Sequence, residues 1–189
     1  MQVQWESILD GVIIRLSAKM DDNEYMAFGI SGTEGRTRMV GGDVTVAYFN
    51  SDDGKFHADD YHLSSKAQVH YPFPFTMLPV QDRTSLTDFI DQCDGSSGVC
   101  PDERAGGRND ASALDGQRLN GVTTVVYQRS LDIQEGFDQR IPLVGRVNVI
   151  AAIGPLNSRK EANYHSHRTG PTGILIRSFL FYFFFNFNY

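Results

Sequence analysis

Short runs of β-branched and aromatic residues, each followed by a turn rich in glycine, aspartate or asparagine, recur along this chain. The clearest runs are residues 12–18, 25–30, 43–49, 121–130 and 146–153. No segment keeps a helical period of apolar residues over several turns. Because the chain also holds 18 glycines and 12% aromatic residues, which suit tight turns and pleated surfaces, the sequence indicates an all-β sandwich or barrel.

Turn residues and polar stretches locate the expected hairpins and loops. The dipeptide Asp10-Gly11 is a strong hairpin signal between strands at residues 3–5 and 12–18. The turn at residues 51–54 precedes a further expected strand at 56–63. Residues 105–120 are polar and contain glycine, so we expect them to be mostly loop.

Length and composition favour one domain with two atypical segments. A chain of 189 residues suits a single domain, which we place at residues 1–170. Residues 69–92 combine prolines and aromatics without a period, and we expect a long loop or insertion there. Residues 171–189 end in an aromatic tail. The stretch 174–181 would suit a final strand, and the apolar run is shorter than the roughly 20 residues of a transmembrane helix.

The distribution of charge limits the classes of partner. The formal net charge is -6, with acidic residues scattered along the chain. Nucleic-acid binding calls for a basic stripe, so it is not indicated. The sequence offers no constellation of nucleophile, acid and base, and an enzyme in its own right is therefore the least favoured class.

The two cysteines bear on the compartment. Cys93 and Cys100 are separated by six residues, among them two glycines and two serines, so the segment is pliable enough to close a small disulfide ring. Two free thiols are the alternative, and two cysteines are too few for a structural zinc site. A disulfide indicates an extracellular protein. Residues 1–5 do not resemble a signal peptide, so we expect an incomplete N-terminus or another route.

One methionine and two histidines stand out as candidate metal ligands. Met39 lies in the polar, glycine-rich stretch 31–42, where packing on a periodic apolar face does not explain a thioether. His165 and His167 lie in the polar segment 164–167. Methionine and histidine form an axial pair for haem iron. The alternatives are a methionine packed under its own loop and two exposed histidines.

Several motifs in order carry a resemblance to a known family. They are Trp5, Tyr-Met-Ala-Phe-Gly-Ile-Ser (25–31), Met-Val-Gly-Gly-Asp-Val (39–44), Cys-Pro-Asp-Glu-Arg (100–104), Tyr-Gln-Arg-Ser (127–130), Ala-Ile-Gly-Pro-Leu-Asn (152–157) and Tyr-His-Ser-His (164–167). Together they resemble the DOMON domain, within the Skeletor and Knickkopf branch of that superfamily. The resemblance covers about residues 3–170, interrupted at 69–92.

The resemblance implies a fold, a cofactor and a ligand pair. Members of the family are antiparallel β-sandwiches of immunoglobulin-like architecture that bind haem b or, in other branches, are proposed to bind sugars. The family's axial ligands match Met39 and His165 here, with His167 as the alternative. We expect Phe28 and Tyr48 to line the haem pocket and Arg129 to pair with a propionate. Core packing for the aromatics and a surface ion pair for Arg129 are the alternatives.

Two functions of different class follow. The first is a haem b-binding module for one-electron transfer to a redox partner, within a longer, multidomain extracellular protein. The second is a non-redox module of the extracellular matrix or cuticle that binds a glycan or a protein.

Overall fold

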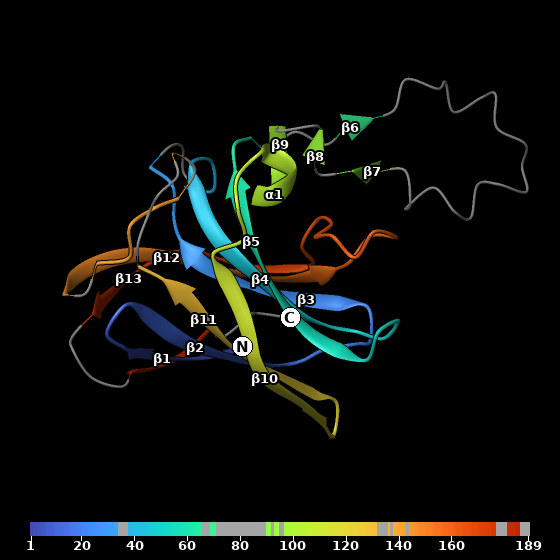
Figure 1. The fold of residues 1–189 in the computed structure, drawn as a ribbon, viewed down its shortest axis with the longest axis horizontal. Helices are drawn as coiled ribbons and strands as arrows, with labels where there is room; N and C mark the ends of the chain where they lie inside the picture. The colour runs from blue at the N-terminus through green and yellow to red at the C-terminus, as the bar shows by residue number, and fades with distance from the viewer. Residues whose placement is uncertain are drawn as a thin grey trace, which may run out of the picture.

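The structure is a computed structural model, and it describes residues 1–33, 38–65, 69–70, 90–91, 93–94, 97–131, 136, 138–142, 144–176 and 181–185. The described strands form two large antiparallel sheets (Figure 1). The five-stranded sheet has the order β10 (Ala111–Leu119), β11 (Val122–Ser130), β2 (Gly11–Lys19), β1 (Gln2–Ser7) and β14 (Phe181–Phe184).

The seven-stranded sheet carries the rest of the architecture. Its order is β13 (His167–Ile176), β12 (Gly145–Pro155), β3 (Glu24–Ile30), β4 (Gly42–Asn50), β5 (Lys55–Leu63), β9 (Ser97–Pro101) and β8 (Cys93–Asp94). A separate short ladder joins β6 (Val69–His70) to β7 (Ile90–Asp91), and α1 (Asp102–Ala105) is a single turn beside β9. In the described part of the chain, no helix is both long and apolar enough to cross a bilayer. The predicted all-β antiparallel sandwich is confirmed.

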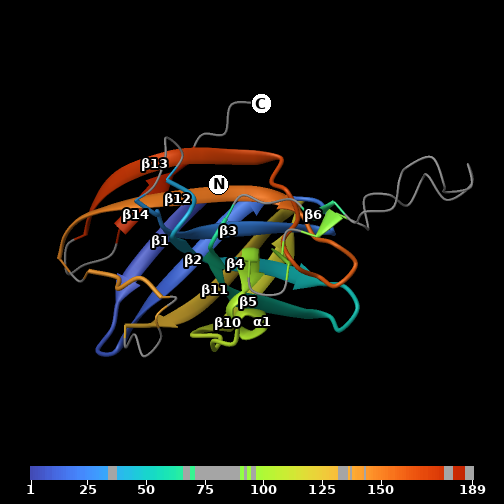
Figure 2. The ribbon, with the colours of Figure 1, turned by 90° about the horizontal axis from the view of Figure 1, so that it is seen from above.

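The main core lies between the two sheets. Side chains alternate along each strand, so that Val12, Ile14 and Leu16 of β2 are buried while Arg15 is exposed. From the opposite sheet Phe28 meets Trp5 edge-on, with ring centroids 6.2 Å apart. Such aromatic pairs stabilise a fold by more than the burial of their apolar area alone. Figure 2 shows β12 and β13 running side by side along one margin of the sandwich.

The hairpins test the turn signals. The predicted hairpin at Asp10-Gly11 joins β1 to β2, and the strands expected at 25–30, 43–49, 56–63, 121–130 and 146–153 are all present. The prediction that residues 105–120 are mostly loop is wrong, because β10 pairs along its length with β11. Asn120 and Gly121 both have positive φ, 53° and 75°, as a two-residue hairpin turn of the primed type requires. β10 is an exposed edge strand, so its polar side chains gave no alternation by which the sequence could indicate a strand.

The C-terminal residues extend both sheets. The expected boundary at residue 170 falls inside β13, and Ile174 of that strand is buried. β14 pairs with β1, and the buried Phe185 lies against Phe28 with ring centroids 6.1 Å apart. Most of the expected insertion, residues 71–89 and 92, lies outside the described residues, as do 177–180 and 186–189.

Gly29 in β3 gives a stability prediction. A Cβ atom there would overlap the carbonyl oxygen of Asp43 on β4, and both partners are backbone in a paired ladder. We expect Gly29→Ala to lower the free energy of unfolding by about 3 kcal/mol, at the upper end of overpacking costs. Gly170→Ala is the matched control, because no heavy atom lies within 4 Å of a Cβ there. Urea denaturation that gave equal stabilities for both variants would contradict this packing.

Candidate functional site

The outer face of the seven-stranded sheet is apolar where an antiparallel sheet usually meets water. Tyr25 and Ala27 of β3 and Val44 and Val46 of β4 point away from the main core, and all four are buried. They form a second apolar cluster, whose other buried members are Tyr48, Tyr61, Leu63, Leu156 and Ala162. A sheet that is apolar on both faces needs a cover on each.

A cavity of about 270 Å³ lies over this outer face. Its floor is made of small and branched side chains from the strands, and its walls come from the turn before β4 and the loop before β13. Two of the predicted ligands, Met39 and His165, line it together. The other lining residues are Tyr25, Ala27, Val44, Val46, Leu63, Val99, Ile150, Ala151, Ala152, Ala162, Asn163, Tyr164, Arg168 and Thr169.

Backbone hydrogen bonds hold the turn that carries Met39. The amide of Gly42 donates to the carbonyl of Met39 at 2.8 Å, which closes the turn. The amide of Gly41 donates to the carbonyl of Leu63 at 2.7 Å, so the end of β5 fixes the turn from the side. Met39 itself is half-buried and packs against the outer apolar cluster. Its thioether is therefore held at the cavity wall by a braced backbone.

The loop from Leu156 to Ser166 presents His165. The hydroxyl of Tyr25 donates to the carbonyl of Asn163 at 2.9 Å, and the amide of Ala162 donates to the hydroxyl of Tyr61 at 3.2 Å. Two tyrosines of the outer face therefore support the loop from below. The backbone of His165 passes so close to Gly154 that a Cβ there would lie 2.7 Å from the Cα of His165. Glycine in β12 permits this approach.

The surroundings of His165 favour a neutral ring. The side chain is partly exposed, and its ring lies 4.6 Å from that of Tyr164, centroid to centroid. Burial lowers the pKa of His165, and the positive charge of Arg168 lowers it further. A neutral imidazole keeps a nitrogen lone pair for a metal. The cavity thus combines a thioether, an imidazole and an apolar floor.

Comparison with known proteins identifies a relative of this chain. No family model matches the chain. Over 166 residues, 87% of its length, it is 32% identical to Protein Skeletor, isoforms B/C, of Drosophila melanogaster, and equally to isoforms D/E. The chain is homologous to a segment of Skeletor. It covers 18% of the first of these proteins and 9% of the second, so it spans less than a fifth of either relative.

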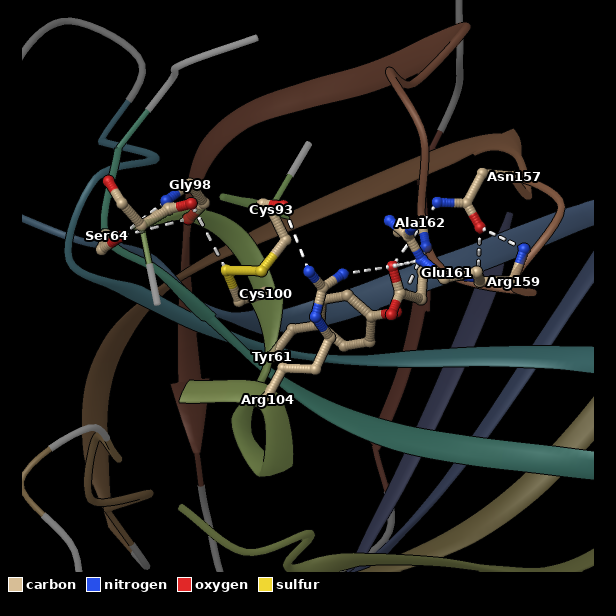
Figure 3. Close-up of a disulfide and its surroundings, with 11 residues drawn as sticks. Tyr61, Ser64, Cys93, Gly98, Cys100, Arg104, Asn157, Arg159, Glu161 and Ala162 are labelled. Atoms are coloured by element: carbon tan, nitrogen blue, oxygen red, sulfur yellow. Dashed lines mark hydrogen bonds and ion pairs between the residues drawn. A yellow bond between two sulfur atoms is a disulfide. The ribbon is translucent and has the colours of Figure 1, made fainter. Parts of the chain in front are cut away.

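This relative of Skeletor contains the predicted disulfide. Cys93 and Cys100 are bonded to each other, and both are buried. Figure 3 shows the guanidinium of Arg104 between this bridge and the loop that carries His165. Arg104 donates to the carbonyl of Cys93 at 3.4 Å and to the carboxylate of Glu161 at 2.8 Å. The disulfide hairpin and the His165 loop are therefore tied together.

Removal of the disulfide should be measurable. The bond joins residues seven apart in sequence, and closing so short a ring in the unfolded chain is worth roughly 2 kcal/mol. We expect the double variant Cys93→Ser, Cys100→Ser to lose about that much free energy of unfolding in urea. A reducing agent should do the same to the native chain and should leave the double variant unchanged. Equal stability of native chain and variant would contradict a structural bridge.

The structure places the other predicted site residues elsewhere. Phe28 is 1% exposed in the core between the sheets, and Tyr48, on the outer face, donates to the carboxylate of Asp59 at 2.9 Å. Neither lines the cavity among the described residues. His167 begins β13, with its ring 3.0 Å from the hydroxyl of Ser166, and it also lies outside the described lining.

Arg129 lies between the sheets rather than at the cavity. It is 3% exposed, and its Nη2 is 2.5 Å from Asp43 Oδ1 and 3.0 Å from Asp60 Oδ2. It is therefore no surface ion pair. Burial lowers the pKa of Arg129, but the carboxylates of Asp60 and Asp43 raise it more. Sequence reasoning missed this charge cluster, whose signal was the alternation that puts Asp43 and Asp60 on the inner face.

Proposed function

We propose that the chain is a DOMON-type module that binds haem b through Met39 and His165 and transfers single electrons. The observation that carries the proposal is that these two side chains, far apart in sequence, line one apolar cavity. Sulfur and imidazole nitrogen are the donors that favour haem iron in electron-transfer proteins. The position of His167 outside the described lining favours His165 as the second ligand.

The shape and charge of the cavity suit a flat, largely apolar group with acidic substituents. Ala27, Val44 and Ala152 line the cavity with short side chains, so that a planar ring can lie against the sheet. Arg168, also in the lining, is exposed and is the second residue of β13, an edge strand of the seven-stranded sheet. A guanidinium there can pair with a carboxylate that reaches the solvent. We assign Arg168 this role in place of Arg129.

The volume supports a cofactor with an exposed edge. About 270 Å³ lies just below the range of about 300 to 1,000 Å³ typical of small-molecule sites. A cavity of this size would enclose part of a haem macrocycle and leave the rest at the surface. An exposed edge suits exchange of electrons with a partner protein. Met39 and His165 would hold the haem iron, and the group would then supply one-electron chemistry without a free coordination site for a substrate.

The setting that we propose is a longer extracellular protein. A disulfide is usual outside the reducing compartments of the cell, and the chain spans a small part of the Skeletor proteins. A redox partner would then be another domain or another protein.

Reconstitution with haem b tests the proposal. The full chain, refolded with excess haem, should bind one equivalent and give a low-spin absorption spectrum. Met39→Ala and His165→Ala should each lose the low-spin bands, because one axial donor is gone. His167→Ala is the matched control and should keep them. A chain that stays colourless would contradict haem binding. An unchanged spectrum in Met39→Ala and His165→Ala would contradict these two residues as ligands.

A second candidate is a non-redox module that binds a glycan. Tyr164 is 57% exposed and lines the cavity, and an exposed ring beside an apolar floor can stack on a sugar. In a pull-down with insoluble chitin, this function predicts retention that Tyr164→Ala abolishes and Met39→Ala leaves intact. Retention with a colourless protein would favour it over the haem module.

A further inference from the structure

Four carboxylates meet between the two sheets, away from the cavity. Asp43 and Asp60 come from β4 and β5, Asp102 begins α1, and Asp138 lies in the segment 138–142. Ligand oxygens of Asp43, Asp60 and Asp138 all lie within 4.8 Å of one another. Asp43, Asp60 and Asp102 are each 1% exposed.

The charges in this cluster do not balance. Arg129 faces the carboxylates with a single positive charge. Several buried carboxylates against one guanidinium leave negative charge that needs a cation or protons.

Several buried oxygens in the cluster also lack hydrogen-bond partners. Among the described residues, Asp102 Oδ1 and both carboxylate oxygens of Asp138 accept no hydrogen bond from an amide, hydroxyl or guanidinium, and their polar neighbours are the carboxyl groups of each other and of Asp110. Asp60 Oδ2 has the ion pair with Arg129 but no hydrogen bond. The hydroxyl of Tyr127, which is 0% exposed, has Thr45 as its side-chain partner and lies in the field of Asp60 and Asp43. Buried polar atoms without partners are rare and point to a missing ion or water.

We propose that this cluster binds one Ca²⁺ ion, with Asp43, Asp60 and Asp138 as ligands and Asp102 completing the negative shell. The donors are all oxygens, which hard cations prefer. Ca²⁺ accepts six to eight oxygens in a flexible arrangement, whereas Mg²⁺ requires a near-ideal octahedron and keeps several waters. A dry site assembled from carboxylates of separate elements within 4.8 Å of one another therefore suits Ca²⁺ better than Mg²⁺.

The site would brace the turn that carries Met39. The backbone amide of Gln139 donates to Asp43 Oδ2 at 2.5 Å, and its side-chain amide donates to the carbonyl of Gly41. Segment 138–142 thus joins the carboxylates to the turn. An ion bound by Asp138 and Asp43 would hold segment 138–142 against β4, and with it the contact of Gln139 to the turn.

Thermal unfolding of the full chain tests the site. The protein is stripped with EDTA, and its melting temperature is compared with and without about 2 mM CaCl₂, where we expect a rise of roughly 5 °C. Asp138→Asn and Asp102→Asn should each lose most of this rise. Asp21→Asn is the matched control, because Asp21 is exposed and outside the cluster, and it should keep the rise. MgCl₂ at the same concentration should give a smaller one.

The outcomes are decisive in either direction. No rise with CaCl₂, or the same rise in Asp138→Asn as in the native chain, would overturn the site. An equal rise with MgCl₂ would overturn its assignment to Ca²⁺. Terbium luminescence sensitised by tyrosine gives a second measurement, independent of stability. We expect native protein and Asp21→Asn to bind Tb³⁺ and release it to CaCl₂, and Asp138→Asn to show no bound emission.

Discussion

Arg129→Met is expected to lower the free energy of unfolding by about 3 to 5 kcal/mol, the cost of leaving buried charges without their partner. The guanidinium is 3% exposed and contacts Asp43 and Asp60, whose carboxylates are also buried. Methionine fills a similar volume, so the loss reports charge rather than a cavity. Urea denaturation in EDTA measures it without compensation by a bound cation.

Two further variants show whether the buried charges cause this loss. Arg159→Met also removes an arginine that pairs with a carboxylate, but its side chain is 50% exposed, and we expect less than about 1 kcal/mol. Adding Asp43→Asn to Arg129→Met should recover part of the stability, because it removes one uncompensated carboxylate. A native-like stability of Arg129→Met would show that the cluster is not charged as described.

Met39→His is expected to keep a low-spin spectrum and to lower the reduction potential of the haem-loaded protein by on the order of 0.2 V, within the range of about 0.8 V that axial ligands span. A thioether is a soft, neutral donor that favours ferrous iron and raises the potential. Imidazole at the same place favours ferric iron more. Spectroelectrochemical titration of the native chain and the variant measures the difference.

His167→Ala is the control for that titration. Its ring lies beside Ser166 and outside the described lining of the cavity, so the potential should not change. If Met39→His left the potential at its native value, the sulfur of Met39 would not be a ligand. If His167→Ala changed it as much as Met39→His, the partner histidine would be misassigned.

Local sequence signals predicted most strands but not β10. The runs with β-branched residues gave β2, β3, β4, β11 and β12, because these strands are buried on at least one face. β10 forms one edge of the five-stranded sheet with most of its side chains exposed, so its polar sequence resembles that of a loop. The Asn120-Gly121 dipeptide was the available signal for that hairpin.

The candidate cavity was predictable from two separate motifs, and the charge cluster was not. Met39 and His165 each stood out as a polar-loop residue of unusual type, and the family resemblance paired them. The nearly continuous apolar runs of β3 and β4 also indicated that both faces of these strands are buried. The cluster draws single residues from β4, β5, β11, α1 and segment 138–142. Strand alternation places Asp43 and Asp60 on the inner face, but only the register of the sheets and the position of segment 138–142 bring the whole cluster together.

A crystal structure of the haem-loaded protein would show which side chains bind the iron. We expect one haem b in the cavity over the outer face of the seven-stranded sheet, with iron bonded to the sulfur of Met39 and a ring nitrogen of His165. Iron bonded to any other pair of side chains, or a haem bound outside this cavity, would contradict it.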